Sequence, residues 1–210
     1  MPVSARFEFD NTVVALWRVT ESVEELALLA GKDNADFASS AFKGLKRQKE
    51  WLAARALLRA MAGDEFRVQY DDYKKPSLVG GGFISISHTC GYVAVALSTV
   101  EPVGLDIELQ TRDVTAVAPR FVHNDDFAGF VPPVSNVQLL FHWCVKEAVF
   151  KLSGDCGGTY KENITVGPFK SSSGVSVASI VGLGNADALF RVNYVLSHGL
   201  LVVLCRHSMS

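Results

Sequence analysis

The chain has 210 residues, of which 49% are hydrophobic and 20% are charged, and its formal net charge is −2. A chain of this size and composition can bury its core as one or two compact units. The slight negative charge excludes a broadly basic nucleic-acid surface, although not a local basic patch for phosphate groups. The apolar runs are far too short to span a bilayer. Acids near the N-terminus exclude a secretory signal peptide, so we expect a cytoplasmic protein that binds no membrane.

The first half of the chain begins with strands and continues with helices. Alternating apolar residues predict two strands, and Ser22 in front of an apolar stretch predicts a capped helix. A polar link leads to a stronger helical pattern, which Gly63 ends. A polar loop and a hairpin that turns at Cys90 and Gly91 follow. The expected elements are strands at 6–9 and 12–17, helices at 23–29 and 46–61, the loop at 70–76, and strands at 83–87 and 92–98.

The second half repeats this pattern and ends in a longer run of strands. A strand comes first, and a short helix and a Val-Pro-Pro-Val segment separate it from a long helix. A Gly-rich loop ends the long helix, and Ser, Gly and Asn turns separate the remaining strands. The expected elements are strands at 103–108, 164–166, 175–181, 188–195 and 200–205, helices at 115–121 and 136–152, the Val-Pro-Pro-Val segment at 131–134 and the Gly-rich loop at 153–158.

Strands and helices are segregated along the chain, which favours an α+β fold. The order of strand, helix and further strands occurs twice, so we expect two similar α+β halves packed on each other, residues 1–102 and 103–210. The two halves show no evident residue identity, so the repeat is one of pattern alone.

Two acids lie within the apolar strand Gly104-Leu105-Asp106-Ile107-Glu108. Side chains alternate along a strand, so Asp106 and Glu108 share one face with Gly104, while the apolar residues share the other. Two carboxylates on a stiff element suit a hard cation such as Mg²⁺, which completes its shell with water and substrate phosphate. A solvated strand face is the alternative, and it is the commoner explanation of an isolated Asp-x-Glu pair.

The long helix adds a third carboxylate and two ammonium groups. Trp143, Glu147 and Lys151 are spaced four residues apart on the side opposite an apolar stripe, and Lys146 is expected beside them. An exposed ion pair between Glu147 and Lys151 is the alternative, and it contributes only about 0.3 kcal/mol. Because a tryptophan is unfavourable in a solvated row, we expect this row to face a cleft.

Basic residues elsewhere suit phosphate groups. Ser87 and His88 are neighbours in a strand and point to opposite faces, so they cannot be the nucleophile and base of a hydrolase. A structural role is the commoner alternative for His88, whose ring can otherwise donate to a phosphate oxygen. Arg47 and Arg55 lie in an i, i+4 row of a helix, and Lys75 precedes a proline that stiffens its loop. Ordinary surface charge is the alternative for these three.

Five motifs occur between Arg47 and Lys151 in the order KEWLAAR, KKP, SISHT, GLDIE and WCVKEAVFK. Together they resemble the phosphopantetheinyl transferase superfamily, whose marks are a GxDxE strand and a WxxKExxxK helix. The chain length is similar to that of the surfactin-synthetase-activating (Sfp-like) branch, in which two similar α+β halves form a pseudodimer within one chain. The resemblance therefore implies this 4′-phosphopantetheinyl transferase fold and a monomer.

The resemblance implies transfer of the 4′-phosphopantetheine arm of coenzyme A to a serine of an apo carrier protein, with release of adenosine 3′,5′-bisphosphate. By the match, Asp106, Glu108 and Glu147 bind Mg²⁺, or alternatively Mn²⁺, together with the coenzyme A pyrophosphate. Lys151 neutralises the pyrophosphate, and Glu147 takes the serine proton directly or through water. The expected catalytic residues are therefore Asp106, Glu147 and Lys151.

The same match implies which residues contact coenzyme A. The first half is expected to bind the adenylate end and its 3′-phosphate, and the second half the metal and the diphosphate. The expected coenzyme A contacts are Arg47, Arg55, Lys75, Ser87, His88, Lys146 and Lys151.

Two features depart from the family pattern. The family often has a glutamate after the short helix that follows GxDxE, as a further metal ligand or base, and Asp126 is the best match here, with a shorter reach. Where relatives commonly read GKP, this chain has Lys74, Lys75 and Pro76, so this loop is expected to lie differently.

The implied protein partner is an apo acyl or peptidyl carrier of fatty acid, polyketide or peptide synthesis. Such carriers are generally acidic, so we expect a small basic surface near Arg112 and Arg120 to receive one. One rival function is another magnesium enzyme that acts on phosphate esters of coenzyme A or nucleotides, and it would cleave coenzyme A without a protein acceptor. The other rival is a non-catalytic coenzyme A binding protein, which would tolerate loss of Glu147.

Overall fold

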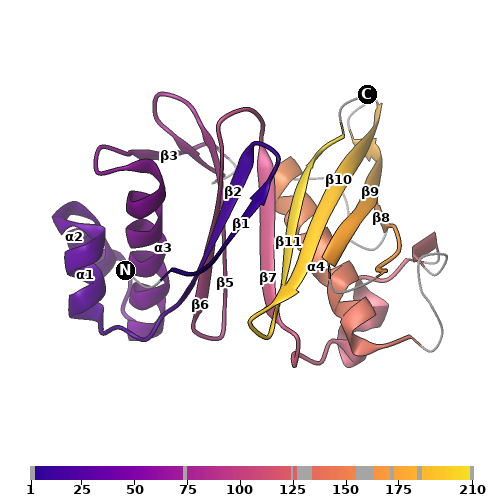
Figure 1. Ribbon diagram of the computed structural model, residues 1–210, viewed down its shortest axis with the longest axis horizontal. Helices are drawn as coiled ribbons and strands as arrows, with labels where there is room; N and C mark the ends of the chain where they lie inside the picture. The colour runs from indigo at the N-terminus through magenta and orange to yellow at the C-terminus, as the bar shows by residue number, and fades with distance from the viewer. Residues whose placement is uncertain are drawn as a thin grey trace. The chain divides into compact units, whose positions relative to one another are not determined.

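The structure is a computed structural model that describes residues 3–72, 75–123, 125–126, 134–154, 163–170, 173–183 and 186–208, without the side chains of 181–183 and 186–187. The chain divides into two compact units. Unit 1 comprises Met1–Gln69 and Pro76–Val100, and unit 2 comprises Tyr70–Lys75 and Glu101–Ser210. Within the described residues, each unit is a mixture of helices with an antiparallel sheet, as Figure 1 shows, so the class is α+β.

The elements of unit 1 are β1 (Val3–Phe9), β2 (Thr12–Arg18), α1 (Val23–Ala30), α2 (Lys32–Ala41), α3 (Leu45–Ala62), β3 (Val68–Tyr70), β4 (Pro76–Leu78), β5 (Phe83–Thr89) and β6 (Tyr92–Ser98). Ser22 caps α1 in a capping box with Glu25, and Gly63 ends α3, both as the sequence predicts. The β5–β6 hairpin turns at Cys90 and Gly91, whose φ angles of 38° and 81° suit a tight two-residue turn.

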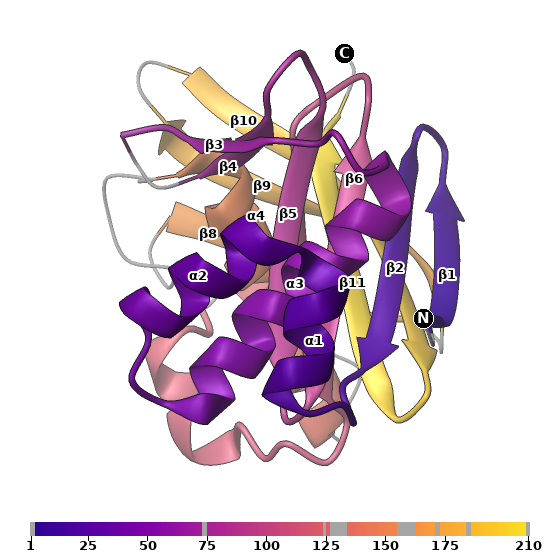
Figure 2. The same cartoon turned by 90° about the vertical axis from the view of Figure 1, so that its left-hand side faces the viewer.

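The helices of unit 1 lie on one face of its sheet, with α3 against β6 and β2 (Figure 2). α2 replaces the polar link that the sequence predicts, and this prediction was wrong. Its sequence contains Asn, Asp and Ser, which favour turns and caps when they are judged alone. Packing overrides that preference, because Ala38 is buried in the core of unit 1 and the Asn34 side chain donates to the carbonyl of Ala30 at 2.9 Å.

The elements of unit 2 are β7 (Val103–Leu109), η1 (Thr115–Arg120), α4 (Asn136–Ser153), β8 (Ile164–Val166), β9 (Ser173–Leu183), β10 (Ala186–Ser197) and β11 (Leu200–His207). Ser135 caps α4 in a capping box with Gln138, and Gly154 follows α4 with a φ of 77°. The predicted short helix is a 3₁₀ helix with Pro119 inside it. The Val-Pro-Pro-Val segment and the Gly-rich loop lie mostly outside the described residues.

The two units share one strand order. In unit 2 the order across the sheet is β7-β11-β10-β9-β8, and in unit 1 it is β2-β6-β5-β4-β3 with β1 added beside β2. In each unit, the strand before the central helix pairs with the last strand, as β2 pairs with β6 and β7 with β11. The helix in between has 18 residues in both cases.

The helices of the described residues include none that combines the length and the apolar character needed to cross a membrane.

Candidate functional site

The acidic face of β7 is turned toward α4. β7 is an edge strand of its sheet and is buried along nearly its whole length. A side chain at Gly104 would overlap the backbone carbonyl of Ala148, so the two backbones meet where Gly104 leaves room. Since Asp106 and Glu108 share a face with Gly104, both carboxylates point toward the helix. They are 5% and 7% exposed.

Asp106 binds a lysine of α4. The Nζ of Lys151 lies 2.9 Å from Oδ1 of Asp106 and also donates to the carbonyl of Leu105 at 2.9 Å. The side chain of Lys151 is 28% exposed, so this residue extends from the surface to a nearly buried acid. The structure thus brings together an acid and a base that the sequence predicts in one site.

Glu108 forms an ion pair with Arg112, a residue that was expected in a carrier-binding surface. The guanidinium of Arg112 lies 5.1 Å from the centre of the Trp143 ring, and the ring of Phe121 lies 5.3 Å from it. Trp143 therefore contacts both a cation and an aromatic ring. This arrangement explains why a tryptophan occupies the charged row of α4.

Glu147 lies on the part of α4 that faces β7. It is half-buried, three residues after Cys144 and four before Lys151. Both of these neighbours lie near Asp106. Lys151 binds it. Burial raises the pKa of Cys144 well above its usual value, and the nearby Asp106 carboxylate raises this pKa further. Residues three and four apart share one side of a helix. Glu147 therefore lies in the same row as the two residues that reach Asp106.

The described part of the chain contains no group of three or more His, Cys, Asp and Glu side chains arranged to hold a metal ion. In this structure Asp106 and Glu108 bind Lys151 and Arg112. The chemistry of the donor set nevertheless fits Mg²⁺, because carboxylate oxygens are the ligands that this ion prefers.

Unit 1 carries a separate basic cluster on α3 and β5. Nη1 of Arg47 lies 2.9 Å from Nε2 of His88 and 3.4 Å from Glu50. A guanidinium only donates, so Nε2 accepts, and the ring proton then lies on Nδ1, which is 3.5 Å from Glu50. Arg47 and His88, both expected to contact phosphate, are thus together and exposed. Glu50, which orients both of them, was missed because nothing in its spacing distinguishes it from a surface acid.

Three other residues expected to contact coenzyme A lie in less accessible places. Arg55 is 3% exposed, with its guanidinium 3.8 Å from the centre of the Trp51 ring, and Ser87 is also 3% exposed. Lys75 donates through Nζ to the carbonyl of Leu152 in the last turn of α4, and burial lowers its pKa. Lys74 lies outside the described residues.

Lys146 is placed differently from the expectation. It is 1% exposed and binds Asp126, the residue that matches the family's additional glutamate. Asp126 is itself fully buried. Lys146 therefore does not lie beside Glu147 and Lys151 in one charged row, and we assign it no contact with coenzyme A. The reason is its position on the helix, about 100° away from Glu147, which turns it into the core of unit 2.

A comparison of the sequence with models of known protein families gave no match, and a comparison with curated proteins gave none either.

Proposed function

We propose that this chain transfers the 4′-phosphopantetheine group of coenzyme A to a serine of an apo acyl or peptidyl carrier protein, giving the holo carrier and adenosine 3′,5′-bisphosphate. The observation that carries the proposal is the contact of Lys151 with Asp106, because it joins the GxDxE strand to the KExxxK helix. Together the two elements present acids for a cation and a base for a phosphate. The sequence motifs supply the substrate class.

We assign the metal to Asp106, Glu108 and Glu147, whose carboxylates are oxygen ligands suited to Mg²⁺ or Mn²⁺. When bound, such an ion neutralises charge on the diphosphate of coenzyme A and on the phosphate that leaves. Asp106 and Glu108 are held nearly buried on a strand, so their charges are fixed before the substrate arrives. Preorganised charge of this kind is worth a few kcal/mol, about 3 for one interaction.

Lys151 and Glu147 have the chemical roles in this proposal. The side chain of Lys151 is partly exposed and its ammonium lies beside Asp106, so we assign to it the neutralisation of the negative charge that gathers on the transferred phosphoryl group. Glu147 is half-buried in the same row of α4 and accepts the proton of the serine hydroxyl, directly or through one water. The serine oxygen then forms the new bond to phosphorus as the bond to the adenosine bisphosphate breaks.

We further propose that the chain has the fold of the phosphopantetheinyl transferase superfamily. The shared strand order of the two units, in each of which an 18-residue helix follows the strand that pairs with the last strand, supports two similar halves. The packing of these halves as a pseudodimer, the assignment of the adenylate end to the first half and the contacts of Arg47, Ser87 and His88 with it stay predictions.

The proposal is tested by following release of adenosine 3′,5′-bisphosphate from coenzyme A and Mg²⁺ with and without an apo carrier protein. A transferase releases it only when the carrier is present. Release without the carrier would favour the rival hydrolase. Binding of coenzyme A with no release in either case would favour the non-catalytic protein and contradict the proposal.

A further inference from the structure

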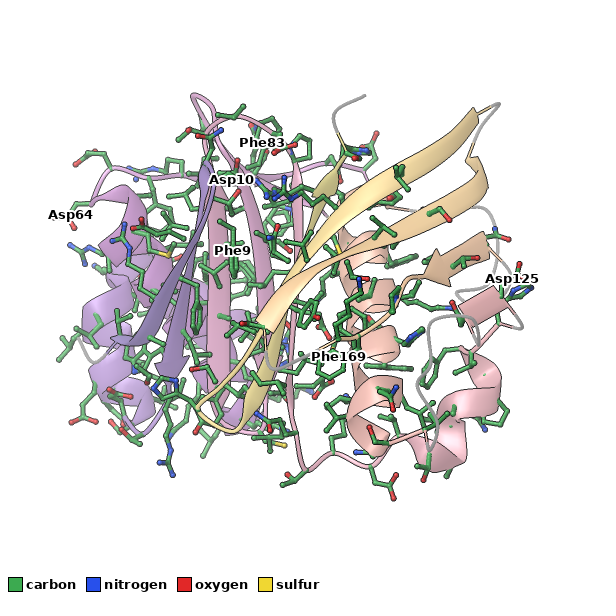
Figure 3. All side chains as sticks on the ribbon, turned by 45° about the vertical axis from the view of Figure 1, so that its right-hand side comes forward. Phe9, Asp10, Asp64, Phe83, Asp125 and Phe169 are labelled. Atoms are coloured by element: carbon green, nitrogen blue, oxygen red, sulfur yellow. The ribbon has the colours of Figure 1, made fainter. Side chains whose placement is uncertain are left out.

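A buried pair of opposite charges lies in the core of unit 2, outside the residues assigned to the metal and to coenzyme A. Nζ of Lys146 lies 2.7 Å from Oδ2 of Asp126 and donates a second hydrogen bond to the carbonyl of Phe121 at 2.6 Å. Lys146 is 1% exposed and Asp126 is 0% exposed. The adjacent Asp125 points outward in Figure 3, with 75% of its side chain exposed. The chain therefore directs one of two neighbouring acids inward.

Asp126 joins three segments of unit 2. Its Oδ2 accepts from the amide of His123 and its Oδ1 from the amide of Val166 in β8, both at 2.8 Å. The ring of His142, one turn before Lys146 on α4, lies 3.8 Å from Oδ1. Burial acts to raise the pKa of Asp126, but the nearby His142 ring, the Lys146 ammonium and the hydrogen bond from the His123 amide outweigh it and lower the pKa to about 2. The carboxylate is therefore charged at neutral pH.

Lys146 lies on the side of α4 that faces away from β7. Successive helical residues are rotated by about 100°, so Lys146 is about 140° from Lys151 and about 160° from Cys144. Lys151 and Cys144 are residues of α4 that lie next to Asp106. The helix α4 therefore forms ion pairs on two sides, with Asp126 on one side and with Asp106 on the other.

The chemistry of the Asp126–Lys146 pair is better suited to fixing the orientation of α4 than to stabilising the fold. Two apolar side chains of similar volume would fill the same space with comparable stability, because desolvation of two buried charges offsets most of their attraction. Apolar packing is non-directional, however, and leaves the rotation of a helix loosely fixed. Hydrogen bonds between charged groups accept only a narrow range of distances and angles. An ion pair at this position therefore fixes where α4 can sit.

We propose that Asp126 and Lys146 are positioning residues, which fix the orientation of α4 so that Glu147 and Lys151 lie opposite Asp106. Asp126 then acts as the counterion of Lys146 and not as a metal ligand or a base. The consequence for the reaction rate rests on the proposed function, whereas the consequence for the contact of Lys151 with Asp106 does not.

The test replaces both charges at once, as Asp126→Leu with Lys146→Met, so that no buried charge loses its partner. This double variant is expected to fold with a lowered denaturation midpoint, because no buried charge is left unpaired but the amides of His123 and Val166 lose the carboxylate to which they donate. Its kcat for carrier modification should fall at least tenfold, while KM for coenzyme A changes less than threefold. The control is Arg206→Met, which removes another buried cation of unit 2, one that binds Asn193 and Glu101 instead of α4. This control should keep the wild-type kcat per folded molecule.

A second measurement decides the inference even if the wild type transfers nothing. Lys151→Met is introduced into the wild type and into the double variant, and the unfolding equilibrium constant is measured by denaturant titration. If the Asp126–Lys146 pair positions Lys151, Lys151→Met should change the unfolding equilibrium constant less in the double variant than in the wild type. The factor by which it changes this constant should be at least threefold smaller. An equal effect in both backgrounds, or a folded double variant with kcat within twofold of wild type, would overturn the proposal. A double variant that fails to fold would also contradict it, because it would assign the pair to stability.

Discussion

Lys151 of α4 lies 2.9 Å from Asp106 of β7, and 45 residues of sequence separate the two. The contact places the C-terminal turns of the long helix against an edge strand that carries two acids. It depends on Gly104, which lets α4 approach, and on the alternation of the strand, which turns Asp106 toward the helix. The candidate chemistry of unit 2 is built around this contact.

Removal of either member of this pair should abolish most of the activity. Asp106→Asn and Lys151→Met are each expected to lower kcat/KM for carrier modification about a hundredfold or more, because each removes a charge that stabilises the transition state. The cost in unfolding free energy should be small for Asp106→Asn, about 1 kcal/mol, since Lys151 still reaches solvent. It should be larger for Lys151→Met, which removes a cation from the nearly buried carboxylate of Asp106. The matched control is Lys170→Met, an exposed lysine of unit 2, which should change neither quantity. Activity of both variants within a few-fold of wild type would contradict the assignment.

Gly104→Ala should destabilise unit 2. The added methyl group would overlap the carbonyl of Ala148, a backbone atom that cannot move without displacing α4. Overpacking of this kind costs about 1–3 kcal/mol, and the displaced helix should also lose its contact with Asp106. Denaturant unfolding and the transfer assay measure the two effects. Gly44→Ala is the control, because a methyl group there meets open space, and it should cost less than about 1 kcal/mol.

The stability of unit 2 should depend on pH through Asp126 and His142. The folded pKa of Asp126 is about 2, below its ordinary value of about 3.9, so its contribution is complete above pH 4 and is lost as the pH falls toward 2. Burial lowers the pKa of His142, so the unfolded chain takes up a proton that the folded chain does not as the pH falls below about 6.5. Urea unfolding between pH 7 and pH 3 should show both losses.

His142→Leu tests the histidine part of this dependence. The variant should lose the decline in stability between pH 7 and pH 5 and keep the decline below pH 4. An unchanged slope between pH 7 and pH 5 would show that His142 is protonated as easily in the folded chain as in the unfolded one, against its burial beside Lys146 and Asp126.

Charge reversal should affect the kinetics differently at Arg112 and Arg120, the two arginines that the sequence predicts in a carrier-binding surface. Arg120 is exposed at the end of η1, so Arg120→Glu should raise KM for an acidic carrier several-fold and leave KM for coenzyme A unchanged. Arg112 binds Glu108 and covers Trp143, so Arg112→Glu should also lower kcat. Steady-state kinetics with carrier and coenzyme A varied in turn distinguish the effects. Equal kinetics of Arg120→Glu and wild type would remove Arg120 from the docking surface.

The strand and the helix of the site can be predicted from the sequence because the spacing of side chains within one element depends only on neighbouring residues. The alternation of β7 assigns Asp106 and Glu108 to one face, and the spacing of α4 assigns Glu147 and Lys151 to one row. The same reasoning fails for Lys146, because a residue about 100° from Glu147 can belong to either side of a helix. The contacts that hold Lys146 on the inner side come from Asp126, 20 residues away, and from the carbonyl of Phe121, 25 residues away.

The spacing of residues within an element does not predict contacts across turns or the formation of helices with polar sequences. Arg112 lies past the end of β7, where no period predicts that it binds Glu108. The helix α2 has a polar composition and is stabilised by the burial of Ala38 against neighbouring helices. Tertiary packing decides both cases, and a single sequence shows it only indirectly.

The central claim is tested most directly by the mass of an apo carrier protein after incubation with this chain, coenzyme A and Mg²⁺. The account predicts that the intact carrier gains the mass of one phosphopantetheine group on a serine, and that Glu147→Gln gives little or no gain in the same time. A carrier of unchanged mass, under conditions in which the chain is folded and binds coenzyme A, would contradict it.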